Sequence, residues 1–84
     1  MSPDPADDEV RRSVREQLAD GRLFWASGGS TVRRGTGRPC TVCGKPIAKD
    51  SVEREIRGPG DRYALTHEDC YRIWREESRR LQSP

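Results

Sequence analysis

The chain has few apolar side chains for its length. Hydrophobic residues make up 31% of its 84 residues, whereas charged residues make up 36%. No run of about eighteen apolar residues is present, so we predict no membrane-spanning segment. A chain of this size and composition cannot compensate the conformational entropy lost on folding by apolar burial alone. We therefore expect one small domain that is held together by a metal ion or by cross-links.

The sequence also lacks the features of an export signal. Its first residues, MSPDPADDEV, have neither the basic start nor the apolar centre of a signal peptide. We therefore expect a cytoplasmic protein, in which thiols stay reduced and regularly spaced cysteines more often bind metal than form disulfides. The cysteines number three, and this odd count fits ligation by three cysteines and one histidine better than a disulfide framework.

Two pairs of candidate metal ligands have the same spacing. Two residues separate Cys40 from Cys43, and two separate His67 from Cys70. A tight turn can direct both sulfurs of the first pair to one point, and one helical turn would place the second pair on one helix face. We predict one structural Zn²⁺ per chain, bound by these four side chains. A chance arrangement of thiols is an alternative, and so is a redox CxxC, although that motif should open a helix and is followed here by Gly-Lys-Pro.

The N-terminal part of the chain predicts a tail, a helix and a loop. Residues 1–9 are acidic and without apolar periodicity, which indicates a disordered tail. Val10, Val14 and Leu18 recur at every fourth position before Gly21, which predicts a helix that ends at the glycine. The expected organisation is a tail over 1–9, a helix with an apolar anchor over 10–25, a flexible basic loop over 26–37, a zinc module over 38–81 and a tail over 82–84.

The zinc module is expected to contain a β-hairpin and a helix. Over 52–56, Val, Arg and Ile alternate with two Glu residues, and over 63–65, Tyr and Leu alternate with Ala. A turn that contains Gly-Pro-Gly separates the two stretches. A last helix is predicted from Thr66, with Asp69 three residues later as in a capping box. Cys70, Trp74, Glu77 or Ser78, and Leu81 should share a face of this helix. We expect Trp74 in the core, where it would cover the zinc site. Tyr71 and Ile73 should point elsewhere and either pack on the N-terminal helix or face a partner.

The stretch CTVCGKPIAKDSVEREIRGPGDRYALTHEDCYRIW resembles treble-clef and LIM-type zinc modules, which follow the same order of knuckle, hairpin and helix. Its CxxCGKPI start and HxxC close are similar to the first half of a LIM domain. No Cys or His follows Cys70, so the second zinc site of a LIM domain is missing. The whole chain resembles small bacterial proteins with an N-terminal helix, a basic linker and one such module. The resemblance implies a small zinc-stabilised α+β fold, and it implies no activity.

Few groups remain for catalysis once zinc takes its four ligands. Nucleases of the HNH type need further His or Asn residues, and this chain has one His and no Asn. Four protein ligands also leave no open position on the metal for a catalytic water. Glu53 and Glu55 are expected on a solvated charged face of a strand. We therefore predict no enzymatic activity and no small-molecule substrate.

Two classes of partner remain open. Residues 21–49 hold six basic side chains and no acidic one, which would suit an anionic partner. The candidate nucleic-acid contacts are Arg33, Arg34, Arg38, Lys45 and Lys49. The candidate protein contacts are Leu23, Phe24 and Trp25, although this apolar cluster could instead anchor the N-terminal helix on the zinc core. Because the sequence pI of 8.6 is below the strongly basic range, we favour an interaction or adaptor module over a nucleic-acid-binding zinc finger.

Overall fold

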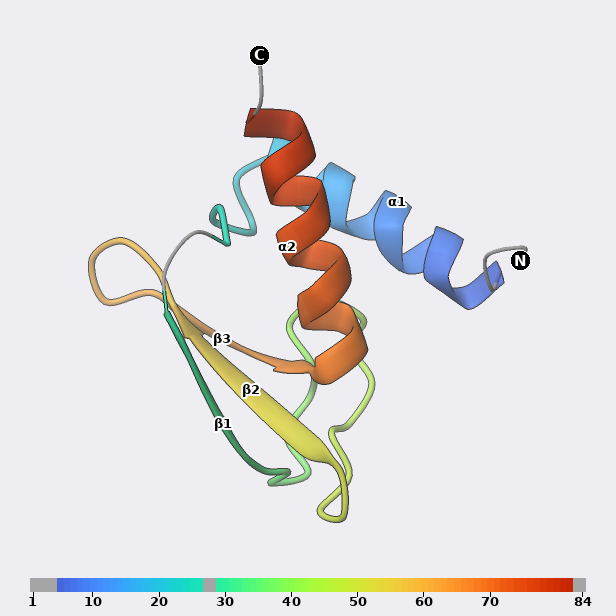
Figure 1. The fold of residues 1–84 in the computed structure, drawn as a ribbon, viewed down its shortest axis with the longest axis vertical. Helices are drawn as coiled ribbons and strands as arrows, with labels where there is room; N and C mark the ends of the chain where they lie inside the picture. The colour runs from blue at the N-terminus through green and yellow to red at the C-terminus, as the bar shows by residue number, and fades with distance from the viewer. Residues whose placement is uncertain (1–4, 27–28, 83–84) are drawn as a thin grey trace.

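The computed structural model describes residues 5–26 and 29–82 (Figure 1). Its elements are, in chain order, α1 (Pro5–Ala19), β1 (Ser30–Arg34), β2 (Val52–Arg57), β3 (Tyr63–His67) and α2 (Glu68–Gln82). The described chain is therefore a small α+β fold, as predicted. Neither described helix is long and apolar enough to cross a membrane.

The three strands form one antiparallel sheet with β2 in the centre. Helix α2 packs on β2 and β3, and α1 packs against α2 on the side away from the strands (Figure 1). The hairpin of β2 and β3 confirms the prediction from alternation. Its turn contains Gly60 at a φ of +63°, a conformation that glycine adopts at little cost.

Strand β1 corrects the prediction of a flexible loop over 26–37. Residues 30–34 pair along their whole length with β2, and Val32 lies opposite Arg54. The strand was missed because its side chains show no apolar alternation: only Ser30 is partly buried, and the other four are exposed. Its strand conformation comes from pairing with β2, not from burial of an apolar face. Residues 27–28 lie outside the described part.

Helix α1 begins earlier than predicted. The expected tail over 1–9 is wrong from Pro5 onward, and residues 1–4 lie outside the described part. Proline is favourable in a first helical turn, because its missing N–H would have no helical partner there. Asp7 and Asp8 in the same turn are favourable for the helix dipole. Gly21, at a φ of +81°, follows the helix end as expected.

The core joins α1 to the rest of the fold. Val14 and Leu18 of α1 are buried, and so are Leu23 and Phe24 after it. The fully buried Trp74 donates its indole N–H to the Phe24 carbonyl at 2.9 Å, and the two rings meet edge to face with centroids 5.1 Å apart. The core position of Trp74 is thus confirmed. Leu23 and Phe24 are the anchor of α1, and Trp25, 41% exposed, is the member of the cluster that reaches the surface.

The hairpin turn also holds the end of α1. Arg62 donates to the carbonyls of Gly21 and Arg22 at 3.3 and 2.9 Å, and its guanidinium lies 5.3 Å from the centre of the Phe24 ring. Since this arginine comes from the segment between β2 and β3, it connects the N-terminal helix to the predicted zinc module.

Helix α2 buries one face, though not the whole face that was predicted. Cys70, Trp74, Glu77 and Ser78 are buried, but Leu81 is 47% exposed because it lies in the last turn, beyond the core. Tyr71 and Ile73 are also buried, which argues against the alternative that they face a partner.

Candidate metal centre

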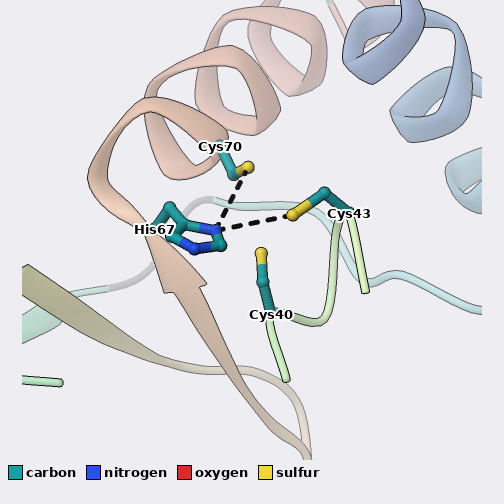
Figure 2. Close-up of side chains that lie close together, drawn as sticks. All are labelled: Cys40, Cys43, His67 and Cys70. Carbon is teal, nitrogen blue, oxygen red and sulfur yellow. Dashed lines mark hydrogen bonds between the residues drawn. The ribbon is translucent and has the colours of Figure 1, made fainter. Parts of the chain in front are cut away.

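The four predicted ligands come together. The ligand atoms of Cys40, Cys43, His67 and Cys70 all lie within 4.8 Å of one another. Figure 2 shows the three sulfurs around the imidazole ring, with Nδ1 of His67 at 3.5 Å from Sγ of Cys43 and 3.8 Å from Sγ of Cys70. The spacing of residues in the sequence therefore identified a real cluster.

These separations fit a tetrahedral zinc ion. Metal–sulfur bonds near 2.3 Å and metal–nitrogen bonds near 2.0 Å place neighbouring sulfur and nitrogen ligands about 3.5 Å apart and neighbouring sulfurs about 3.8 Å apart. The separations of 3.5 and 3.8 Å between Nδ1 and the two sulfurs are close to that requirement. Three thiols and an imidazole are also the donor set that zinc prefers in closed, four-coordinate sites.

A tight turn positions Cys40 and Cys43. The Cys40 N–H donates to the Lys45 carbonyl, and the Gly44 N–H donates to the Cys40 carbonyl, both at 2.8 Å. Gly44 has a φ of +79°, which a residue with a side chain adopts at a cost. The glycine after the second cysteine therefore lets the backbone close the turn with both sulfurs on one side.

The second pair of ligands is positioned differently from the prediction. His67 is the last residue of β3 and lies opposite Glu53 of β2, whereas Cys70 lies in the first turn of α2. The two ligands do not share a helix face, because pairing with β2 keeps the chain extended up to His67. For the same reason Thr66 does not cap the helix: its hydroxyl is buried and has no hydrogen-bond partner within the described chain.

Thr41 connects the two pairs of ligands. Its N–H donates to the Leu65 carbonyl at 2.8 Å, and its hydroxyl accepts from the Leu65 N–H at 3.3 Å. These bonds attach the turn of Cys40 and Cys43 to β3, two residues before His67. Sequence reasoning missed this residue, although its position between the two cysteines was a signal that it belongs to the site.

A carbonyl orients the His67 ring. The Nε2 atom lies 3.1 Å from the Pro46 carbonyl oxygen. A carbonyl only accepts hydrogen bonds, so Nε2 carries the hydrogen and Nδ1 keeps its lone pair toward the sulfurs. This arrangement, in which the second ring nitrogen donates to the backbone, is the usual one for a histidine that binds a metal. Pro46 was also missed as part of the site.

The sulfurs differ in acidity. A hydrogen bond from Cys70 lowers the pKa of Cys40 to about 4, and backbone N–H groups around the turn contribute to this shift. The same contact raises the pKa of Cys70, and burial raises the pKa of Cys43. Ionising the second and third of these thiols therefore costs free energy when no cation is near them. A divalent metal is the kind of group that would stabilise all three.

Glu53 corrects the expectation of a solvated charged face. Its side chain is fully buried and accepts hydrogen bonds at 2.7 Å from Arg33 Nε and from the Thr36 hydroxyl. Burial raises the pKa of the Glu53 carboxyl, but these two hydrogen bonds, the charge of Arg33 and the backbone of Thr36 together outweigh it, so that the net shift is downward. Since β1 and the residues after it cover this position, the burial follows from the strand that the sequence did not reveal.

Three of the five predicted nucleic-acid contacts lie together, because Arg33, Arg34 and Lys49 line the same open hollow of about 590 Å³. Arg33 also pairs with Glu53 and Glu55, at 2.7 and 3.1 Å. Lys45 lines another hollow, between α1 and the metal-binding turn. Arg38 is exposed and lines neither of these two hollows.

The predicted protein contacts separate as well, because two of the three are buried. Leu23 and Phe24 belong to the core, which leaves Trp25 as the exposed residue of that cluster.

Comparisons of the chain with protein-family models, with curated proteins and with solved structures find no match.

Proposed function

We propose that this chain is a small interaction module whose fold is maintained by one structural Zn²⁺. The observation that carries the proposal is the convergence of three sulfurs and one imidazole nitrogen within 4.8 Å of one another, with two of the nitrogen–sulfur separations at values suited to a tetrahedral ion. Four protein ligands complete the coordination sphere of such an ion and leave no position for a substrate or a catalytic water.

The ligands come from the parts of the fold that most need a connection. Cys40 and Cys43 lie in the turn, His67 at the end of β3 and Cys70 at the start of α2. One ion bound to all four would fix the turn, the hairpin and the helix relative to one another. Structural zinc supplies an apparent free energy on the order of 10 kcal/mol in small modules, comparable with the net stability of a whole domain.

The order of turn, hairpin and helix supports a treble-clef-like description of residues 38–81. The ligand positions support it too, because one pair lies in a turn and the other at the junction of strand and helix. Strand β1 and helix α1 would then be additions, the first extending the sheet and the second covering α2.

A binding role is favoured over catalysis because the single histidine belongs to the metal centre. We propose a protein partner, and a cytoplasmic location in which the thiols stay reduced. Nucleic acid remains the alternative. It is less favoured because Arg33, which shares a hollow with Arg34 and Lys49, is paired with two carboxylates, and because Lys45 lines a different hollow.

Native mass spectrometry of protein purified without added zinc tests the metal assignment. We expect one zinc per chain, and zero or two would contradict the proposal. His67→Cys and His67→Ala form a matched pair, because the first keeps four ligands and the second keeps three. The cysteine variant should retain zinc at chelator concentrations that remove it from the alanine variant. Equal retention by the two variants would exclude His67 as a ligand.

A further inference from the structure

Strand β1 forms one edge of the sheet, and its hydrogen-bonding pattern can be deduced. The Gly35 N–H donates to the Ser51 carbonyl at 2.9 Å, directly after the last paired residues of β1 and β2. In an antiparallel ladder, hydrogen-bonded pairs alternate with non-hydrogen-bonded pairs. The backbone groups of Thr31 and Arg33 therefore bond to β2, whereas those of Val32 and Arg34 point away from the sheet. In the described part of the chain, β1 pairs with no other strand.

The opposite edge of the sheet is closed. The Gly58 N–H donates to the Arg62 carbonyl at 2.9 Å, so alternation directs the backbone groups of Leu65 outward from β3. There the Leu65 carbonyl accepts from the Thr41 N–H, and its N–H donates to the Thr41 hydroxyl. The turn that contains Cys40 and Cys43 thus occupies the middle of the β3 edge, and β1 is the edge that remains open along its length to an additional strand.

Apolar and basic side chains lie beside the open edge. Val32 and Val52 are 52% and 44% exposed. The register places Val52 directly opposite Arg34, so the two valines are diagonal neighbours on one face of the sheet. Both valines line the hollow of about 590 Å³, together with Arg33, which pairs with two glutamates, and with the cations Arg34 and Lys49. No ion pair involves either of these two cations within the described residues. Asp50 is the only acidic residue of the lining.

We propose that the outer edge of β1 pairs with an extended segment of a partner protein, in which apolar residues alternate with acidic ones. The inference rests on the proposed interaction function and names its surface and the chemistry of its partner. Backbone hydrogen bonds to Val32 and Arg34 would supply affinity, as in other cases of strand addition. An apolar side chain would pack on the two valines, and acidic side chains would pair with Arg34 and Lys49.

Charge favours such a segment over a second copy of this chain. Strand β1 contains Arg33 and Arg34 and no acidic residue, so two paired β1 strands would offer no opposite charge to these arginines, and any register that sets them opposite each other would be destabilising. Cations on an edge strand oppose this kind of self-association. The same cations attract an acidic strand.

The test uses zinc-loaded, nitrogen-15-labelled protein and a short peptide in which valine alternates with glutamate. In the free protein, the amides of Thr31 and Arg33 should be protected from hydrogen exchange and those of Val32 and Arg34 should exchange fast. On addition of the peptide, the latter two should shift and become protected. A matched peptide with lysine in place of glutamate should bind about tenfold more weakly, since every favourable charge pair becomes a repulsive one.

Three variants sharpen the test. Val32→Pro removes one outward N–H, and proline is tolerated on an edge strand where that group faces solvent. Arg34→Glu reverses the charge beside the valines. Arg12→Glu makes the same change of net charge on an exposed position of α1 and is the control. We expect the first two to weaken peptide binding and the control to leave it unchanged.

Several outcomes would overturn the inference. One is a folded, zinc-bound protein whose Val32 and Arg34 amides do not respond to saturating peptide. Another is a response confined to other residues, or one produced at this edge by a single-stranded oligonucleotide and not by the peptide. If Val32→Pro fails to fold, the amide response of the unmodified chain and the Arg34→Glu variant decide. A sample that is folded without bound zinc would contradict the proposed function itself.

Discussion

Replacing Arg11 should destabilise the protein more than replacing Glu77, although the two residues form one ion pair between α1 and α2. The Glu77 side chain is fully buried, and Arg11 Nη1 donates to its Oε1 at 3.3 Å. Arg15 Nε lies 3.6 Å from Oε2, which has no hydrogen-bond partner in the described chain. The side chains of Arg11 and Arg15 are 27% and 47% exposed. Removing Glu77 therefore leaves arginines that water already reaches, whereas removing Arg11 takes a partner from a carboxylate that is fully buried in the unmodified fold.

The size of each effect follows from this asymmetry. Breaking a buried ion pair from one side typically costs about 3–5 kcal/mol, because a charge stays behind without a partner. Arg15 and Arg80 remain near the carboxylate, at 3.6 and 3.9 Å, so we expect Arg11→Ala to cost less than that, about 2–4 kcal/mol. Glu77→Leu replaces the charge by an apolar side chain of similar volume and should change stability by about 1 kcal/mol or less, in either direction. The double variant should resemble Glu77→Leu, since the unpaired charge is absent from both.

The assay is urea unfolding of zinc-saturated protein, followed by circular dichroism at neutral pH. A lower midpoint with an unchanged slope reports a loss of stability without a change in the extent of unfolding. Arg15→Ala is the control, because Arg15 makes no hydrogen bond to Glu77 and should have a smaller effect than Arg11. If Glu77→Leu costs as much as Arg11→Ala, or if the double variant costs as much as Arg11→Ala alone, the reasoning is wrong.

Three further predictions concern the loop after β1, a buried acid and the alternative partner. Gly35→Ala should destabilise the fold by at least about 1 kcal/mol, because the Cβ of the new alanine would overlap the Ala48 carbonyl oxygen. A thermal unfolding midpoint that is not lowered would contradict this. Glu53→Gln should be less stable than the unmodified chain at neutral pH. The difference in stability should shrink as the pH falls from 4.5, the ordinary pKa of the carboxyl, through its lower pKa in the folded chain, because protonation of Glu53 removes the stabilising effect of the carboxylate. A difference in thermal unfolding midpoint that does not change with pH would refute this prediction. If nucleic acid is the partner, fluorescence titration should show affinity that falls steeply with salt, with a shallower salt slope after Arg34→Ala and Lys49→Ala. Binding that vanishes at physiological salt would remove this alternative.

The cluster of candidate metal ligands could be predicted from the sequence because the spacing of its members is local. Two residues between Cys40 and Cys43 fit one tight turn, and two residues between His67 and Cys70 bring both to one side of the chain whether they lie on a helix or at its junction with a strand. The prediction therefore identified the ligands although it placed His67 in the wrong element. The hairpin was predictable for a similar reason, since alternation and a glycine turn are local features.

Strand β1 could not be predicted, because its conformation depends on residues about twenty positions away. Its side chains are mostly exposed and glycines flank it, so it has no apolar period of its own. The burial of Glu53 follows from the same pairing, with Arg33 directly opposite on β1. An error in one strand thus led to an error in the environment of a carboxylate on its neighbour.

A proton–nitrogen correlation spectrum, recorded before and after removal of zinc by a strong chelator, tests most directly whether the metal maintains the fold. We expect the dispersed amide signals of β2, β3 and α2 to collapse toward those of an unfolded chain, and to return when one equivalent of Zn²⁺ is added back. Metal analysis of the same sample must show that the zinc is gone. A spectrum that keeps its dispersion in metal-free protein would contradict the account.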